Sequence, residues 1–176
     1  EALCAQGRNF SNKIWNAFRL VHGWEVAHDM AQPACAAKGI AWFEARSAQV
    51  LTEVEHAFDE FRLSEALMLI YKHIWDDFCS VYLELAKPPF GEPIDAATLA
   101  STTAIFERML SMLHPFMPFL SEEVYARLAK RAKGTLLSCS AWPENKSQNE
   151  AELASNTQLL KDFDLTMRIV AEVRGI

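Results

Sequence analysis

Apolar residues recur at helical spacing along almost the whole chain, and the first segment shows this pattern most clearly. When successive residues are placed about 100° apart, as in an α-helix, its apolar residues share one arc of about 100°. Gly23, a residue type that often follows the last turn of a helix, stands next in the chain. The pattern therefore predicts a helix over residues 3–22 with a buried stripe of Phe10, Ile14, Ala17, Phe18 and Val21.

The following segments alternate between helix-breaking residues and the same apolar spacing. A stretch that contains Pro33 and Gly39 predicts a loop or an irregular connection. Beyond it the spacing predicts a second helix over residues 41–61 and a third helix that begins at Ser64 as its N-cap. The third helix should end before Pro88, because the residue that precedes a proline avoids the α conformation.

Two more helices are predicted in the second half of the chain. Asp95 is a suitable N-cap for a fourth helix, which should end before Pro115. Ser121 is followed by two glutamates, which are favoured near a helix N-terminus, so we expect a fifth helix to begin there. The bases between residues 130 and 133 should lie in its last turn. His114 is expected to bond the last carbonyls of the fourth helix.

A final helical pattern covers residues 150–174, after a mostly non-helical stretch over 135–148. The predicted fold is therefore all-α, a bundle of five or six helices. We assign residues 1–143 to the bundle. Residues 144–176 are assigned to a final helix that leads toward a C-terminal arm beyond Ile176.

Composition narrows the class of protein. Hydrophobic residues make up 51% of the 176 residues, yet no apolar run approaches the roughly 20 residues that a membrane helix needs, so no membrane contact is expected. The four cysteines are far apart and form no C-x-x-C pair, which favours reduced thiols in a cytoplasmic protein. They are Cys4, Cys35, Cys79 and Cys139.

The sequence contains no motif for catalysis or for metal binding. It lacks a glycine-rich phosphate loop, a nucleophile elbow and a pair of histidines at metal-binding spacing, so we expect no catalytic residue, no metal and no cofactor in this chain. Asp76 and Asp77 are adjacent on a helix and point in different directions, so solvation or local pairing is expected. Trp75, Phe78 and Tyr82 have the spacing of a core stripe.

Charge is distributed unevenly along the chain. The net charge is −6, which taken alone argues against a nucleic-acid partner. Residues 44–95 hold eleven acids and four bases, whereas residues 2–24 hold three bases and no acid at all. The first helix is thus the segment best suited to meet a phosphate backbone.

The polar side of the first helix combines cations with amides. Arg8, Asn9, Asn12, Lys13, Asn16 and Arg19 fall within an arc of about 140°, and Leu20 lies in the same arc. Cations suit phosphates, and amides can both donate to and accept from the edges of unpaired bases. The residues alone leave two interpretations open, an ordinary solvated face and an RNA-binding surface.

A family resemblance bears on that choice. Residues 7–19, GRNFSNKIWNAFR, resemble the signature G-R-N-F-x-N-K-L-W-N-A-x-R that opens the anticodon-binding domain of valyl-tRNA synthetases. The resemblance continues through IWDDFC at 74–79, YLELAKP at 82–88, LHPFMPFLSEE at 113–123 and Trp142-Pro143, in the order found in the family.

The resemblance implies a domain that follows a Rossmann catalytic core and binds the anticodon stem-loop of tRNA(Val). By position, the contacts would be Lys13, Asn16, Arg19 and Leu20, to which helical geometry adds Arg8, Asn9 and Asn12. The parent synthetase would activate valine with ATP and Mg²⁺ and then charge the tRNA. The H-I-G-H and K-M-S-K-S motifs for that step are absent here, so the chain should be inactive without its catalytic domain.

Two alternatives remain open from the sequence. The acidic segment 44–95, or an exposed apolar stripe, could make this chain a helical scaffold for protein interactions. The same fold could also belong to an isoleucyl-tRNA synthetase.

Overall fold

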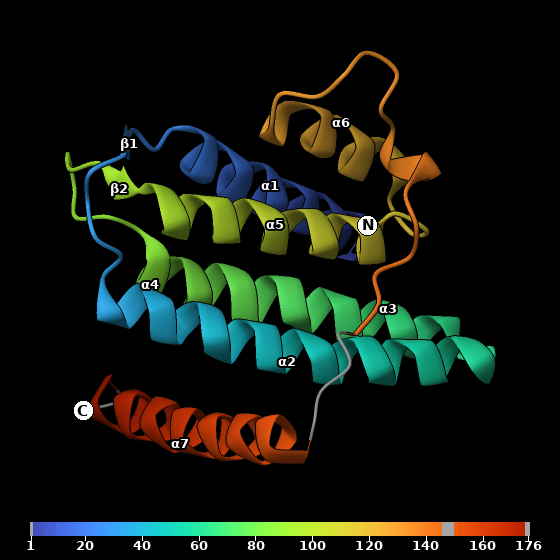
Figure 1. Ribbon diagram of the computed structural model, residues 1–176. Helices are drawn as coiled ribbons and strands as arrows, with labels where there is room; N and C mark the ends of the chain where they lie inside the picture. Colours follow the sequence, from blue (N-terminus) through green and yellow to red (C-terminus); the bar gives the residue numbers. More distant parts are fainter. Residues whose placement is uncertain (1, 146–149, 175–176) are drawn as a thin grey trace.

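The computed structural model describes residues 2–145 and 150–174, and these residues form a bundle of six helical rods (Figure 1). Two short strands and one turn of 3₁₀-helix complete the described fold, which confirms the predicted all-α class. The rods are α1 (Ala2–His22), α2 (Ala34–Asp59), the continuous α3–η1–α4 rod (Leu63–Lys72, His73–Tyr82 and Leu83–Ala86), α5 (Ala96–Leu113), α6 (Pro118–Leu128) and α7 (Glu150–Arg174). The other elements are β1 (Val26–Ala27), β2 (Ile94–Asp95) and η2 (Leu137–Cys139).

The rods are stacked in layers around one hydrophobic core. Figure 1 shows α1 beside α5, α6 on one side of that pair, α2 and the α3–η1–α4 rod on the other side, and α7 beyond α2. The helix α7 is attached to α2 by a stack of Trp42 on Phe163, whose ring centroids lie 4.4 Å apart. Arg46 on α2 also pairs with Asp164 at 2.9 Å. No described helix combines the length and the hydropathy needed to cross a bilayer.

The first helix agrees with its prediction, but the second begins earlier than predicted. Helix α2 begins at Ala34, directly after Pro33, so the prediction of a loop through Gly39 was wrong. Gly39 is buried in this helix, and a Cβ added there would lie 3.2 Å from Cβ of Leu85. The glycine therefore permits α2 to pack closely against α4, and it does not break the helix.

The third predicted helix exists, although its start and its centre differ from the prediction. Arg62, not Ser64, occupies the N-cap position of α3. Residues His73–Tyr82 form a π-helix, in which the Ser80 hydroxyl donates to the Trp75 carbonyl at 2.8 Å. This wider stretch buries Phe78 and Tyr82 completely, as the predicted core stripe requires, while Trp75 is only partly buried.

The predicted bounds of the fourth helix are confirmed at both ends, whereas the predicted start of the fifth helix is wrong. Asp95 caps α5 by accepting a hydrogen bond from the Thr98 N–H at 2.8 Å, and the helix ends at Leu113. Helix α6 begins at Pro118, a residue type common in a first helical turn, so Ser121 lies inside it. His114 pairs through Nδ1 with the Ser121 hydroxyl at 2.8 Å, not with carbonyls as predicted.

The end of α6 also differs from the prediction. The helix ends at Leu128, so the bases at 130–133 follow the helix and do not lie in its last turn. Arg131 among them forms an ion pair with Glu107 on α5 and lies 3.4 Å from the centre of the Tyr125 ring. These contacts attach the segment after α6 to the bundle.

A two-strand parallel pairing, which the sequence did not predict, joins distant parts of the chain. Val26 pairs with Ile94 and Ala27 with Asp95. The Ile94 N–H also donates to the Glu25 carbonyl at 2.8 Å. As a result, the segment that precedes α5 is held beside the C-terminal end of α1.

Candidate nucleic-acid interface

Helix α1 separates a buried apolar side from an exposed polar side. Phe10, Ile14 and Val21 are buried against α5, α6 and η1, as predicted. Arg8, Asn9, Asn12, Asn16 and Arg19 are exposed, Lys13 is partly exposed, and Leu20 is 42% exposed. All seven predicted site residues therefore lie on the accessible side of α1, which we call the α1 face.

The cations of the α1 face have no acidic partner within the residues that the structure describes. Arg8, Lys13 and Arg19 take part in no ion pair there, and α1 itself contains no acid. The Lys13 ammonium lies 5.2 Å from the centre of the Trp75 ring, a favourable cation–π arrangement. This contact positions Lys13 without neutralising its charge, so the face stays positive.

A shallow cleft runs between the α1 face and the π-helix. Its volume is about 160 Å³, and Lys13, Asn16 and Leu20 line it together with Ala17, Cys79 and Leu83. Burial raises the pKa of Cys79 to about 11, although the nearby Lys13 charge lowers it. The thiol is therefore neutral at neutral pH, and the cleft offers contact surface and no nucleophile.

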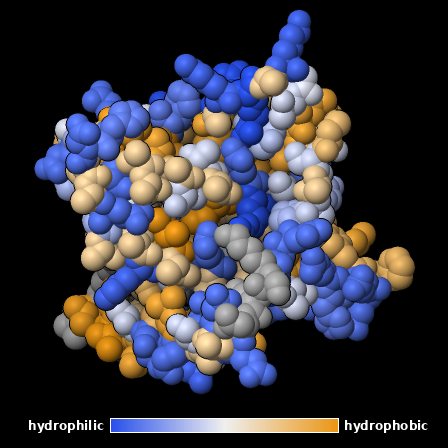
Figure 2. Space-filling view, in the orientation of Figure 1, coloured by the Kyte–Doolittle hydropathy of each residue, from blue (hydrophilic) through white to orange (hydrophobic). Residues whose placement is uncertain are grey.

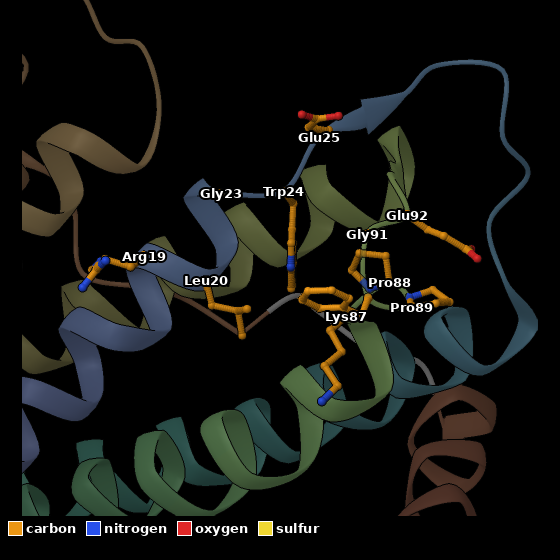
Figure 3. Close-up of a pocket in the computed structure, with 11 residues that line it drawn as sticks. Arg19, Leu20, Gly23, Trp24, Glu25, Lys87, Pro88, Pro89, Gly91 and Glu92 are labelled. Atoms are coloured by element: carbon orange, nitrogen blue, oxygen red, sulfur yellow. The ribbon is translucent and has the colours of Figure 1, made fainter.

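A larger groove adjoins this cleft at the C-terminal end of α1. Its volume is about 690 Å³, and Figure 3 shows Arg19, Leu20 and Trp24 on one side and the turn at residues 87–92 on the other. Leu20 lines both the cleft and the groove, so the two hollows adjoin at this residue. We call the larger hollow the turn groove.

Trp24, Lys87 and Phe90 line the turn groove, but none of them was predicted from the sequence as a site residue. Lys87 and Phe90 stand more than sixty residues from α1 in the sequence. The packing of η1 on α1 and the pairing of β1 with β2 bring them beside it. The available signal was an aromatic residue between Pro88-Pro89 and Gly91, a pattern typical of an exposed turn.

A second polar cluster has the residue types of a hydrolase triad but is closed to substrate. The Ser47 hydroxyl lies 2.9 Å from Nε2 of His73, and Asp77 Oδ2 lies 2.9 Å from Nδ1 of the same ring. Ser47 is 3% exposed and His73 is 1% exposed, and the His73 ring stacks on Phe43. The cluster is a buried hydrogen-bond network, and the local pairing predicted for the two aspartates is confirmed for Asp77.

No group of three or more His, Cys, Asp or Glu residues in the described ranges is placed to hold a metal ion. All four cysteines are free. Cys79 is partly buried, while Cys4, Cys35 and Cys139 are exposed.

Comparison with known proteins identifies the family. The sequence model described as the anticodon-binding domain of tRNA ligase matches residues 41–176. The chain belongs to this family. Over its whole length this anticodon-binding domain is also 46% identical to the valine–tRNA ligases of Porphyromonas gingivalis and Phocaeicola vulgatus. It is 43% identical to that of Christiangramia forsetii, and it spans 19% of the length of each of these three proteins.

The family match and the α1 face cover different parts of this anticodon-binding domain. Helix α1 precedes the matched residues 41–176, although it lies within the segment that aligns with the valine–tRNA ligases. The π-helix, which forms the other wall of the cleft, lies inside the matched range. The cleft thus joins a helix outside the family match to an element within it.

Proposed function

We propose that this chain recognises the anticodon arm of tRNA(Val) through the α1 face, as the anticodon-binding part of a valine–tRNA ligase. The observation that carries the proposal is the set of exposed cations and amides on α1, without acidic partners in the described residues, beside a cleft. Such a set suits an unpaired RNA loop, whose phosphates attract cations and whose base edges match amides.

The side chains of the α1 face form two groups, one suited to the RNA backbone and one suited to the RNA bases. Arg8, Arg19 and Lys13 carry the positive charges and would hold phosphates, the arginines through the directed N–H groups of their guanidinium. Asn16 lies at the cleft beside the apolar Leu20, where a base edge and a base face could be met together. Asn9 and Asn12 continue the amide surface toward the start of α1.

The catalytic reaction would belong to the rest of such a ligase. Its catalytic domain would activate valine with ATP and Mg²⁺ and esterify the tRNA in the cytoplasm, while this chain supplies recognition. Figure 2 shows hydrophobic surface at the end of the molecule where α2 meets α3 in Figure 1. The exposed Phe61, Leu63 and Met68 of that end are suited to contact another part of the ligase. Charging assays with valine and with isoleucine on the full-length protein distinguish the two synthetases.

Removing a cation from the α1 face should weaken RNA binding in a salt-dependent way. Lys13→Ala and Arg19→Ala are each expected to lower the affinity of the chain for a hairpin RNA with the tRNA(Val) anticodon arm. Each should also reduce the slope of log affinity against log salt by about one, because one phosphate contact is lost. Filter binding at several salt concentrations measures both quantities.

Lys161→Ala is the matched control for these variants. Lys161 is an exposed cation on α7, which lies beyond α2 from α1 (Figure 1). Removal of the Lys161 side chain should change neither the affinity for the hairpin RNA nor the slope of log affinity against log salt. If Lys13→Ala and Arg19→Ala bind like the wild type, the α1 face is not the RNA-binding surface, and a protein-interaction scaffold becomes the better interpretation.

Asn16→Ala should affect selectivity more than charge-driven affinity. Because an amide at the cleft can bond a base edge, the variant should narrow the preference for the cognate anticodon over a mutated one by about fivefold or more. The measurement compares affinities for two hairpins that differ only in the anticodon. Equal weakening for both RNAs would assign Asn16 to the RNA backbone instead.

A further inference from the structure

We propose that Phe90, at the tip of the turn over residues 87–92, is a stacking platform for a second unpaired base of the RNA loop. This inference rests on the proposed function, and it extends the interface from the α1 face into the turn groove. It assigns the groove to one occupant, a nucleotide next to the one held at the α1 cleft.

The first reason is the exposure of the Phe90 ring. The residue is 107% exposed, more than the other large hydrophobic residues exposed in the described part of the chain. A phenylalanine in that position leaves about 1.5–3 kcal/mol of burial free energy unused. Both faces of the ring are free to receive a planar partner, and every nucleobase offers such a face.

The second reason is that the backbone that carries Phe90 is held in a defined turn. Pro88 and Pro89 each restrict φ, and the Glu92 N–H donates to the Pro89 carbonyl at 3.0 Å to close the turn. Gly91 has φ of 81°, a left-handed conformation that glycine adopts without strain. The strand pairing at Ile94 then anchors the turn to the end of α1. Binding would therefore cost little additional ordering of the loop.

The third reason is the position and the size of the turn groove. Arg19 and Leu20 of the α1 face line it together with Phe90, so the turn is the neighbouring surface for an RNA strand bound on α1. A volume of about 690 Å³ lies within the range of about 300–1,000 Å³ that is usual for sites of small organic ligands. Trp24 adds a second aromatic surface to the wall (Figure 3).

The charges of the groove indicate that stacking, and not phosphate attraction, would supply most of the binding energy there. Arg19 and Lys87 are matched in number by Glu25 and Glu92, and Lys87 is paired with Glu84 at 2.7 Å. In Figure 3 the Glu25 and Glu92 carboxylates point away from Trp24, so these acids do not cover its ring. The contribution of Phe90 should therefore depend little on salt.

A titration of the 176-residue chain with labelled RNA tests this assignment. The probe is the tRNA(Val) anticodon hairpin, in which 2-aminopurine replaces one unpaired loop base at a time. Each probe is titrated with the wild-type chain and with the variants Phe90→Ala, Phe90→Tyr and Phe61→Ala. Phe61 is 89% exposed at the junction of α2 and α3, the end of the bundle opposite to β1 (Figure 1), and serves as the matched control.

Phe90→Ala is expected to weaken binding by about five- to a hundredfold, the range of one lost base–aromatic stack, with an unchanged salt slope. At one loop position the 2-aminopurine fluorescence should be quenched by the wild type and restored with Phe90→Ala. Phe90→Tyr and Phe61→Ala should both behave as the wild type.

The results separate this inference from the function on which it rests. If Lys13→Ala weakens binding and Phe90→Ala does not, the α1 face binds RNA and the Phe90 platform is wrong. If the wild-type chain shows no salt-sensitive binding to the hairpin, both proposals fail together. Equal weakening by Phe90→Ala and Phe61→Ala would also overturn the platform, since it would show a non-specific loss of apolar surface.

Discussion

Phe78→Ala is expected to lower the free energy of unfolding by about 3–5 kcal/mol, the usual cost of emptying a buried phenylalanine site. Phe78 is completely buried in the π-helix at the centre of the core. Its ring centroid lies 5.7 Å from that of Phe43 on α2, 5.5 Å from that of Tyr82 and 5.0 Å from that of Phe106 on α5. One side chain thus joins three rods, and none of its neighbours can close the cavity alone.

Urea unfolding followed by circular dichroism measures this loss. Phe90→Ala is the matched control, because the same substitution at a fully exposed position should change stability by less than about 0.5 kcal/mol. The comparison also shows that any RNA-binding defect of Phe90→Ala is not a folding defect. A loss below about 1 kcal/mol for Phe78→Ala would mean that the π-helix repacks, contrary to the close contacts described above.

High pH is expected to destabilise the fold by up to about 5 kcal/mol through the partly buried Cys79 and the buried Tyr82. Burial raises the pKa of Cys79 from 9.0 to about 11, against a lowering by Lys13. Burial likewise raises the pKa of Tyr82 from 10.0 to about 12, with a smaller opposing effect of the Thr102 hydrogen bond. Each two-unit difference corresponds to roughly 2–3 kcal/mol.

The direction of the effect follows from which state keeps its protons. Well below pH 9 both groups are protonated in the folded and in the unfolded chain, and their contribution is fully present. Between pH 9 and pH 12 the unfolded chain loses these protons first, so the free energy of unfolding falls as pH rises. Urea unfolding at steps between pH 8 and pH 12 follows this loss.

Two variants identify the groups responsible. Tyr82→Phe should cost about 1 kcal/mol at neutral pH, because the Tyr82 hydroxyl lies 2.7 Å from the Thr102 hydroxyl. It should then lose less stability than the wild type above pH 10. Cys79→Ala should reduce the loss that begins near pH 9. If the free energy of unfolding falls equally with pH in the wild type and in both variants between pH 8 and pH 12, other groups cause the alkaline unfolding.

The π-helix connects these stability effects to the proposed recognition site. Its inward side chains, Phe78 and Tyr82, belong to the core, while Cys79 lines the cleft beside Lys13 and Asn16. Trp75, in the same segment, carries the Lys13 ammonium above its ring. A helix of ordinary pitch would present these residues differently, and π-helical turns are often found beside functional sites.

The sequence by itself determined the helical class, the rod over residues 3–22 with its exposed polar side, the Asp95 cap and the final helix. These features depend on contacts within a few residues, namely apolar periodicity and one side chain bonded to a nearby N–H, so a linear pattern contains the information. The α1 face was predictable for the same reason, because a regular helix fixes which residues share a side.

Only the tertiary structure decided the features that depend on distant partners. Ser64 and Ser121 have the residue type of N-caps, yet Arg62 and Met117 hold those positions without a side-chain cap hydrogen bond. Residue type alone therefore did not decide where these helices begin. Gly39 lies inside a helix, where the absence of a Cβ lets Leu85 of α4 approach closely. The turn groove depends on the packing of η1 on α1 and on the pairing of Val26 with Ile94. These segments are distant in sequence and meet only when the bundle brings them together.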